Sequence, residues 1–290
     1  MKPIKKWAIL LAKLVVTAAA IAFVVSKIQI SELQQILAKV SVLPLVLATL
    51  LFVLSKMVSS LRLRMFLCSS GVEISETTNL KLYWLGMFYN LFLPGGIGGD
   101  AYKVYLLQRA SGISALRLSG AVLLDRVNGL LAILILNLAM FPLLPFPKMW
   151  QWAAILVIIP GYLIYMLGVK RLFPHFHRLT HPTTLWSFGV QLLQCISLLC
   201  IARALQLTTD PLPLLFIFMA SSVVAVLPFT IGGIGSREVV FLLGSQWLAI
   251  PSDAAVTISL LFFVITAVVS LGGIYYQFRP QAIVLQSKTL

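Results

Sequence analysis

Two adjacent charged residues lie inside an apolar stretch, where ionised side chains are rare. Asp125 and Arg126 interrupt residues 118–140, a stretch long enough to cross a membrane. An ionised side chain near the centre of such a span costs about 2.5 to 3.5 kcal/mol, so it needs a partner or a function. Because neighbours on a helix point in different directions, the two residues must find partners elsewhere. At membrane depth they could hold a charged headgroup or relay a proton.

Two glycine-rich segments carry further charged residues. The first reads FLPGGIGGDAYKVYLL at residues 92–107, and the second reads TIGGIGSREVVFLLG at residues 230–244. Both contain the motif GGIG, preceded by a proline and followed by charged side chains. Successive glycine N–H groups can surround an anion, and a helix that begins there adds about half a positive charge. The predicted chemistry is therefore binding of an anionic group beside Asp100, Arg237 and Glu238.

The hypothesis is a cluster near the middle of the membrane that unites both motifs with the charged pair. Its carboxylates could balance the arginines, pair with an amine on a headgroup, or relay protons. The alternative is that the charges form structural ion pairs, while Asp100 and Ser236 cap helices. The candidate substrate-binding residues are Asn90, Pro94, Gly95, Gly96, Gly98, Asp100, Asp125, Arg126, Gly232, Gly233, Gly235, Arg237 and Glu238.

Transmembrane helices must position these residues. The chain has 290 residues, of which 60% are hydrophobic and 10% are charged, and its mean hydropathy is +1.01. In soluble proteins the charged share is roughly 25%. This composition excludes a cytosolic enzyme, a secreted module and a β-barrel. It predicts an all-α polytopic membrane protein that forms a single integral membrane domain over residues 1–290.

Six apolar stretches are long enough to cross a membrane, which takes about 20 residues. They are residues 7–26, 42–61, 118–140, 150–168, 183–205 and 254–277. With the N-terminus inside, most basic residues fall on the cytoplasmic side, among them Arg62 and Lys103, in agreement with the positive-inside rule. Both termini are then cytoplasmic. The net charge of +14 is explained by topology and attraction to anionic lipid, rather than by nucleic-acid binding.

The two glycine motifs lie in repeat-related elements, residues 82–108 and 212–249. Most of the apolar arms beside the glycines are too short to cross about 30 Å of hydrocarbon. Three predicted spans separate the elements, so the second has the opposite orientation, which is typical of an inverted repeat. We expect two re-entrant helical hairpins whose tips line a cavity, because irregular backbone at membrane depth needs polar partners.

These residues also resemble a known family. The runs NLFLPGGIGGDAYKVYLL at 90–107, LLDRVNGL at 123–130 and LPFTIGGIGSRE at 227–238 are similar to the transmembrane region of bacterial lysylphosphatidylglycerol synthases. The resemblance covers nearly the whole chain and implies translocation of modified phospholipids in the bacterial inner membrane. Some relatives are linked to polyisoprenoid-linked sugars or hopanoids. Because the chain ends soon after its last predicted span, we expect no soluble synthase domain and no lysyl transfer from tRNA.

The expected function is flippase-like transport of a phospholipid or a polyisoprenoid-linked anionic lipid, through a midplane site at the two glycine-rich tips. One alternative is an intramembrane enzyme acting on a lipid phosphate or a lipid-linked sugar, which needs an acid, a base and a nucleophile. Another is a carrier of small ions or solutes. The expected partners are membrane phospholipids or polyprenyl-linked lipids, without nucleic acid, cofactor or metal. A homo-oligomer is compatible with the sequence.

Overall fold

The computed structural model describes residues 40–92, 97–226 and 236–278. In these ranges helices joined by loops are found and there is no strand, which confirms the all-α prediction for this part of the chain. Two short 3-10 helices, η1 (Phe141–Leu143) and η2 (Pro174–Leu179), join longer elements. The α-helices are α3 (Val42–Ser69), α4 (Glu76–Phe92), α5 (Gly98–Ser111), α6 (Ala115–Met140), α7 (Lys148–Leu172), α8 (Thr180–Ala204), α9 (Pro211–Val226), α10 (Ser236–Trp247), α11 (Ser252–Leu271) and α12 (Ile274–Phe278).

Five helical segments are long and apolar enough to cross a membrane. They are Val42–Ser69, Ala115–Leu143, Lys148–Leu172, Pro174–Ala204 and Ser252–Phe278. Each contains or overlaps one of the predicted spans, and the remaining prediction, residues 7–26, lies outside the described residues together with both termini. The first of the five is longer than predicted, because α3 continues through Arg62 to Ser69. This extension brings residues expected at the membrane surface into the helix bundle.

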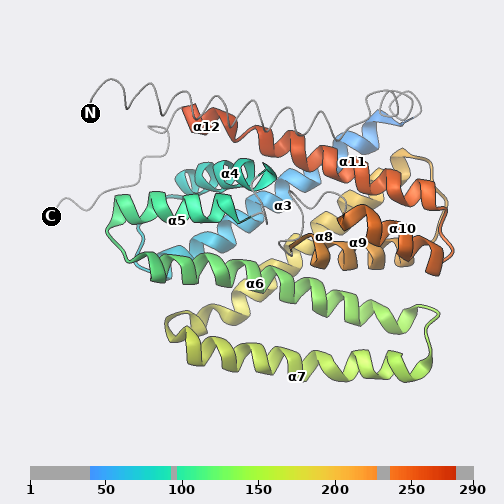
Figure 1. The fold of residues 1–290 in the computed structure, drawn as a ribbon, viewed down its shortest axis with the longest axis horizontal. Coiled ribbons are helices and arrows are strands. Elements are labelled where there is room, and N and C mark those ends of the chain that lie inside the picture. The colour runs from blue at the N-terminus through green and yellow to red at the C-terminus, as the bar shows by residue number, and fades with distance from the viewer. Residues whose placement is uncertain (1–39, 93–96, 227–235, 279–290) are drawn as a thin grey trace.

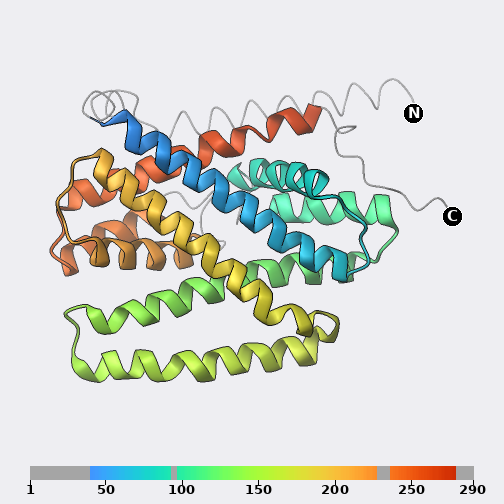
Figure 2. The same cartoon turned by 180° about the vertical axis from the view of Figure 1, so that it is seen from behind.

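Helices α3 and α8 form an antiparallel pair that crosses the bundle diagonally (Figures 1 and 2). At one end of the pair, the Ser41 N–H donates to the Ala204 carbonyl oxygen at 3.0 Å. At the other end, the Ser69 hydroxyl donates to the His175 carbonyl oxygen at 3.3 Å. Between them the Ser197 hydroxyl donates to the Ala48 carbonyl oxygen at 2.8 Å. Small polar side chains thus let the two helices approach closely, as in other membrane helix pairs.

The short helices form two pairs that belong to opposite ends of this antiparallel frame. Pair α4/α5 follows the end of α3, and pair α9/α10 follows the end of α8. In Figure 1 both pairs lie between α6 and α11, one pair beside each half of these long helices. The four helices have 12 to 17 residues. At about 1.5 Å per residue they reach at most about 26 Å, less than the hydrocarbon thickness of about 30 Å.

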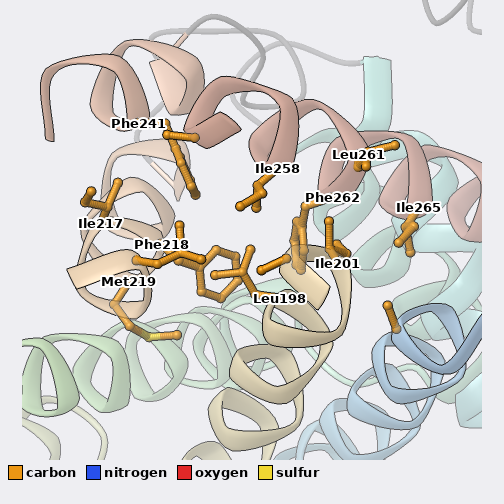
Figure 3. Packing of buried hydrophobic residues seen from close by; sticks show 14 of the residues in the cluster. Leu198, Ile201, Ile217, Phe218, Met219, Phe241, Ile258, Leu261, Phe262 and Ile265 are labelled. Carbon is orange, nitrogen blue, oxygen red and sulfur yellow. The ribbon is translucent and has the colours of Figure 1, made fainter. Parts of the chain in front are cut away.

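The main hydrophobic core surrounds the α9/α10 pair (Figure 3). Phe218 and Phe262 lie at its centre with 4.8 Å between their ring centroids, and Leu198 and Ile258 pack around them. A second core cluster includes Leu63 and residues of α4, α5 and α6. Helix α7 contributes Val169 to the second cluster but exposes most of its other apolar side chains, as expected of a helix that faces lipid.

Candidate functional site

A polar cavity of about 340 Å³ lies at the centre of the bundle. The charged residues that line it are Lys56 and Arg62 of α3 with Asp125 and Arg126 of α6. Asn90 and Leu91 near the end of α4, with Ala225 and Val226 at the end of α9, also line it, so the helices that precede the two glycine motifs end near the same cavity. The predicted tips themselves lie outside the described residues, and with them the candidates Pro94, Gly95, Gly96, Gly232, Gly233 and Gly235.

Asp125 forms a buried ion pair with Arg62. The Arg62 Nε atom donates to Asp125 Oδ1 at 2.7 Å, and Arg62 Nη1 donates to the Ser187 hydroxyl oxygen at 2.7 Å. Gly129 leaves room for the guanidinium, because a Cβ atom there would lie 3.3 Å from Arg62 Nη1. The sequence predicts that Asp125 needs a partner, but it does not identify Arg62 as that partner. The sequence pattern places Arg62 at the cytoplasmic surface, whereas in the structure this residue is buried and only 5% exposed.

Asp100 accepts hydrogen bonds from two cations. Lys103 Nζ lies 2.8 Å from Asp100 Oδ1, and Arg126 Nε donates to Asp100 Oδ2. Arg126 thus pairs with the glycine-motif carboxylate that the sequence suggested. Lys103 was also assigned to the cytoplasmic rim, but it is buried and its Nζ lies 4.9 Å from the centroid of the Tyr83 ring. Gly86 makes space for it, because a Cβ atom there would lie 2.2 Å from Lys103 Cε.

Asn90 connects α4 to the beginning of α5. Its Oδ1 atom accepts a hydrogen bond from the Gly99 N–H at 2.7 Å, so it satisfies one of the free N–H groups in the first turn of α5. Gly98 is the first residue of that helix. Asn90 also lines the cavity. This side chain has a structural role that the sequence did not predict, in addition to its place at the candidate site.

The two charged residues after the second glycine motif make different contacts. The Arg237 guanidinium lies over the rings of Phe218 and Phe262, with Cζ at 5.4 Å and 5.0 Å from their centroids. Glu238 Oε1 accepts a hydrogen bond from the Ser259 hydroxyl at 3.0 Å. The expected cluster is therefore divided, because Asp125 pairs with α3 and Arg237 packs on aromatic rings. A further cation, Lys56, was not singled out, although it interrupts the predicted span 42–61 just as Asp125 interrupts its own.

An apolar groove of about 360 Å³ continues from the polar cavity between α5 and α6. The two share Arg126, Leu130 and Val226. The groove reaches the surface of the bundle, where Ile97 is 51% exposed and Leu123 is 50% exposed. A charged cavity and an apolar groove therefore meet at Arg126, which is bonded to Asp100.

Comparison with known proteins identifies the family. The model of the lysylphosphatidylglycerol synthase TM region matches residues 10–182 and 169–273, well over half of the chain. No curated protein matches the chain. The five membrane-length helical segments agree with this match. The chain is a multi-pass membrane protein, and it belongs to the family of the lysylphosphatidylglycerol synthase transmembrane region.

Proposed function

We propose that this protein moves an anionic lipid, a phospholipid or a polyisoprenoid-linked lipid, between the two leaflets of the bacterial inner membrane. The observation that carries the proposal is the junction of the polar cavity with the apolar groove at Arg126. A lipid has the same division into a charged headgroup and apolar chains. A headgroup in the cavity would keep its polar contacts while its chains lie along the groove toward lipid.

The charged residues would stabilise the headgroup in place of water. A buried charge without a partner is costly, so the cavity must offer exchangeable partners when the headgroup enters. The pairs Arg62–Asp125 and Arg126–Asp100 supply such partners, since each arginine can contact a phosphate while it stays near its carboxylate. The glycine-rich tips would add backbone N–H groups to the same site.

The two short helix pairs would supply alternating access. In this proposal they are inverted re-entrant hairpins, one from each side of the membrane, with their tips at the midplane. Transporters built from inverted repeats rock one repeat against the other around a fixed site. Movement of α4/α5 would open the cavity toward one leaflet, and movement of α9/α10 would open it toward the other. No covalent step on the lipid is needed.

The proposal is tested by a leaflet-sidedness assay on the purified full chain in liposomes. Fluorescent phosphatidylglycerol and a fluorescent polyprenyl phosphate serve as probes, and dithionite quenching reports their leaflet. We expect faster exchange than in protein-free vesicles, with the lipid recovered chemically unchanged. No acceleration with either probe contradicts the proposal. A modified lipid supports the intramembrane enzyme instead, and uptake of labelled ions without lipid exchange supports the small-ion carrier.

A blocked groove provides a sharper test. Leu123→Trp places a large ring in the half-exposed wall of the groove and should slow lipid exchange strongly. The matched control is Leu134→Trp, which changes another partly exposed leucine of α6 that lines neither the cavity nor the groove. Equal exchange rates for the two variants would argue against the groove as the path of the lipid chains.

A further inference from the structure

Two cations are held on one cluster of phenylalanine rings beside the cavity. Lys56 Nζ lies 4.5 Å from the centroid of the Phe52 ring, and Arg237 Cζ lies 5.0 Å from that of Phe262. The rings of Phe52 and Phe262 pack edge to face with 5.5 Å between their centroids. The two positive charges are near enough to interact electrostatically. Cations and rings from α3, α10 and α11 therefore form one unit, which we call the aromatic cation site.

Neither cation of this site forms an ion pair with a carboxylate that the structure describes, although Glu238 is near enough to Arg237 to interact with it electrostatically. Ion pairs occupy Arg62, Lys103 and Arg126, but no described Asp or Glu lies within ion-pair distance of Lys56 or Arg237. The Nη1 atom of Arg237 is buried and has no hydrogen-bond partner among residues 40–92, 97–226 and 236–278. Outside these ranges the sequence contains a single acidic residue, Glu32.

Around the cavity, the described cations outnumber the described carboxylates. Among the described residues in and beside the cavity, five cations (Lys56, Arg62, Lys103, Arg126 and Arg237) outnumber three carboxylates (Asp100, Asp125 and Glu238) by two positive charges. Uncompensated charge is costly away from water. Aromatic faces attract cations without neutralising them. The phenylalanine rings thus hold Lys56 and Arg237 in place without compensating their charges.

We propose that the aromatic cation site binds the phosphate of a lipid phosphomonoester. This inference rests on the proposed function and names the substrate class. A phosphomonoester carries a charge of about −1.5 to −2 and three acceptor oxygens, which matches two adjacent cations. A phosphodiester lipid compensates only one of them, and a zwitterionic lipid adds no net negative charge. Lys56 lines the cavity and would contact the phosphate there, and Arg237 would add its buried Nη1 donor, which has no partner among the described residues.

The test measures lipid binding by the full chain in nanodiscs of phosphatidylcholine. Dioleoyl phosphatidic acid is the phosphomonoester probe, dioleoyl phosphatidylglycerol is the diester probe, and cardiolipin offers two separate diesters. Lipid retained on the protein is quantified by native mass spectrometry. We expect retention of phosphatidic acid over phosphatidylglycerol by about tenfold at neutral pH, decreasing as the pH falls below the second phosphate pKa of about 6. Equal retention of the mono- and diester at all pH values overturns the proposal, as does a preference for cardiolipin.

Variants assign the effect to the two cations. Lys56→Gln and Arg237→Gln should each lower retention of phosphatidic acid by about tenfold, the loss of one charge-assisted contact, and change phosphatidylglycerol less. Lys56→Arg should preserve the preference. The control is Arg64→Gln, also on α3, whose side chain pairs with the exposed Glu76 at 3.5 Å. Unchanged retention in both glutamine variants overturns the assignment.

The outcome is separable from that of the proposed function. If a glutamine variant does not fold, as judged by size-exclusion chromatography, the pH dependence of the wild-type chain still decides. Transfer of phosphatidylglycerol between leaflets without any preference for phosphatidic acid supports the translocation proposal and contradicts this one. A pH-dependent preference without leaflet transfer supports the aromatic cation site and contradicts translocation.

Discussion

The α4/α5 and α9/α10 pairs carry similar motifs but hold their charges in different ways. In α4/α5, Asp100 is bonded to Lys103 and Arg126, so the charge at this helix start is neutralised. In α9/α10, Arg237 lies on phenylalanine rings, and its Nη1 atom has no hydrogen-bond partner in the described part of the chain. After the first motif, Asp100 thus joins an ion-pair network. After the second motif, Arg237 contacts aromatic rings instead of a carboxylate. If the pairs are inverted repeats, they have diverged in their electrostatics.

The largest expected loss of stability comes from breaking the ion pair that joins α3 to α6 beside the cavity. Asp125→Ala leaves the buried Arg62 without its carboxylate, which should destabilise the protein by about 3 to 5 kcal/mol. Thermal unfolding in detergent measures the loss. Glu76→Ala removes the carboxylate of an exposed ion pair between Arg64 of α3 and Glu76 of α4 and should cost at most about 1 kcal/mol. Similar losses in both variants would contradict the burial argument.

A smaller loss of stability is expected when a methyl group is added between the two helices of either pair. A Cβ atom at Gly99 would lie 2.0 Å from the backbone oxygen of Gly86, so Gly99→Ala must separate α4 from α5 and should cost about 1 to 3 kcal/mol. At Gly244 the nearest atom is Ile217 Cγ1 at 2.8 Å, in a side chain that can move, so Gly244→Ala should cost less. Gly161→Ala, with no atom near, is the control. The order of the three unfolding temperatures checks the prediction.

The cap at the start of α5 should contribute about 0.5 to 2 kcal/mol. Asn90→Ala removes the oxygen that accepts the Gly99 N–H and should lower the unfolding temperature accordingly. Asn90→Asp keeps an acceptor at this position and should retain most of the stability. If alanine and aspartate behave alike, the hydrogen bond is not what Asn90 contributes.

The smallest loss of stability is expected at the contact between α10 of the second pair and α11. Ser259→Ala removes the hydroxyl that donates to Glu238 and should cost about 0.5 to 1.5 kcal/mol. Ser259→Thr retains a hydroxyl and is the control. Thermal unfolding of both variants under the same conditions measures the two losses. A larger loss of stability in Ser259→Ala than in Asn90→Ala would contradict the expected order.

Residue patterns were sufficient to predict the helices but not the contacts between them. The five membrane-length helical segments follow from long, mainly apolar runs, which any helical membrane protein must contain. The pairing of Arg126 with Asp100 could be suggested because both are charged and sit at membrane depth. Lys56 could have been found by the same rule. The partner of Asp125 could not, because it is 63 positions away and depends on which faces of α3 and α6 meet.

The sequence by itself determined the class of protein, its family resemblance and the position of its apolar segments, because these depend on local composition and short motifs. Only the tertiary structure decided that Arg62 and Lys103 turn inward, that Gly86 and Gly129 make room for them, and that Lys56 and Arg237 share one aromatic cluster. The physical reason is that ion pairing and cation–π contacts act over a few ångströms. Such contacts join residues from distant segments, and packing alone brings those segments together.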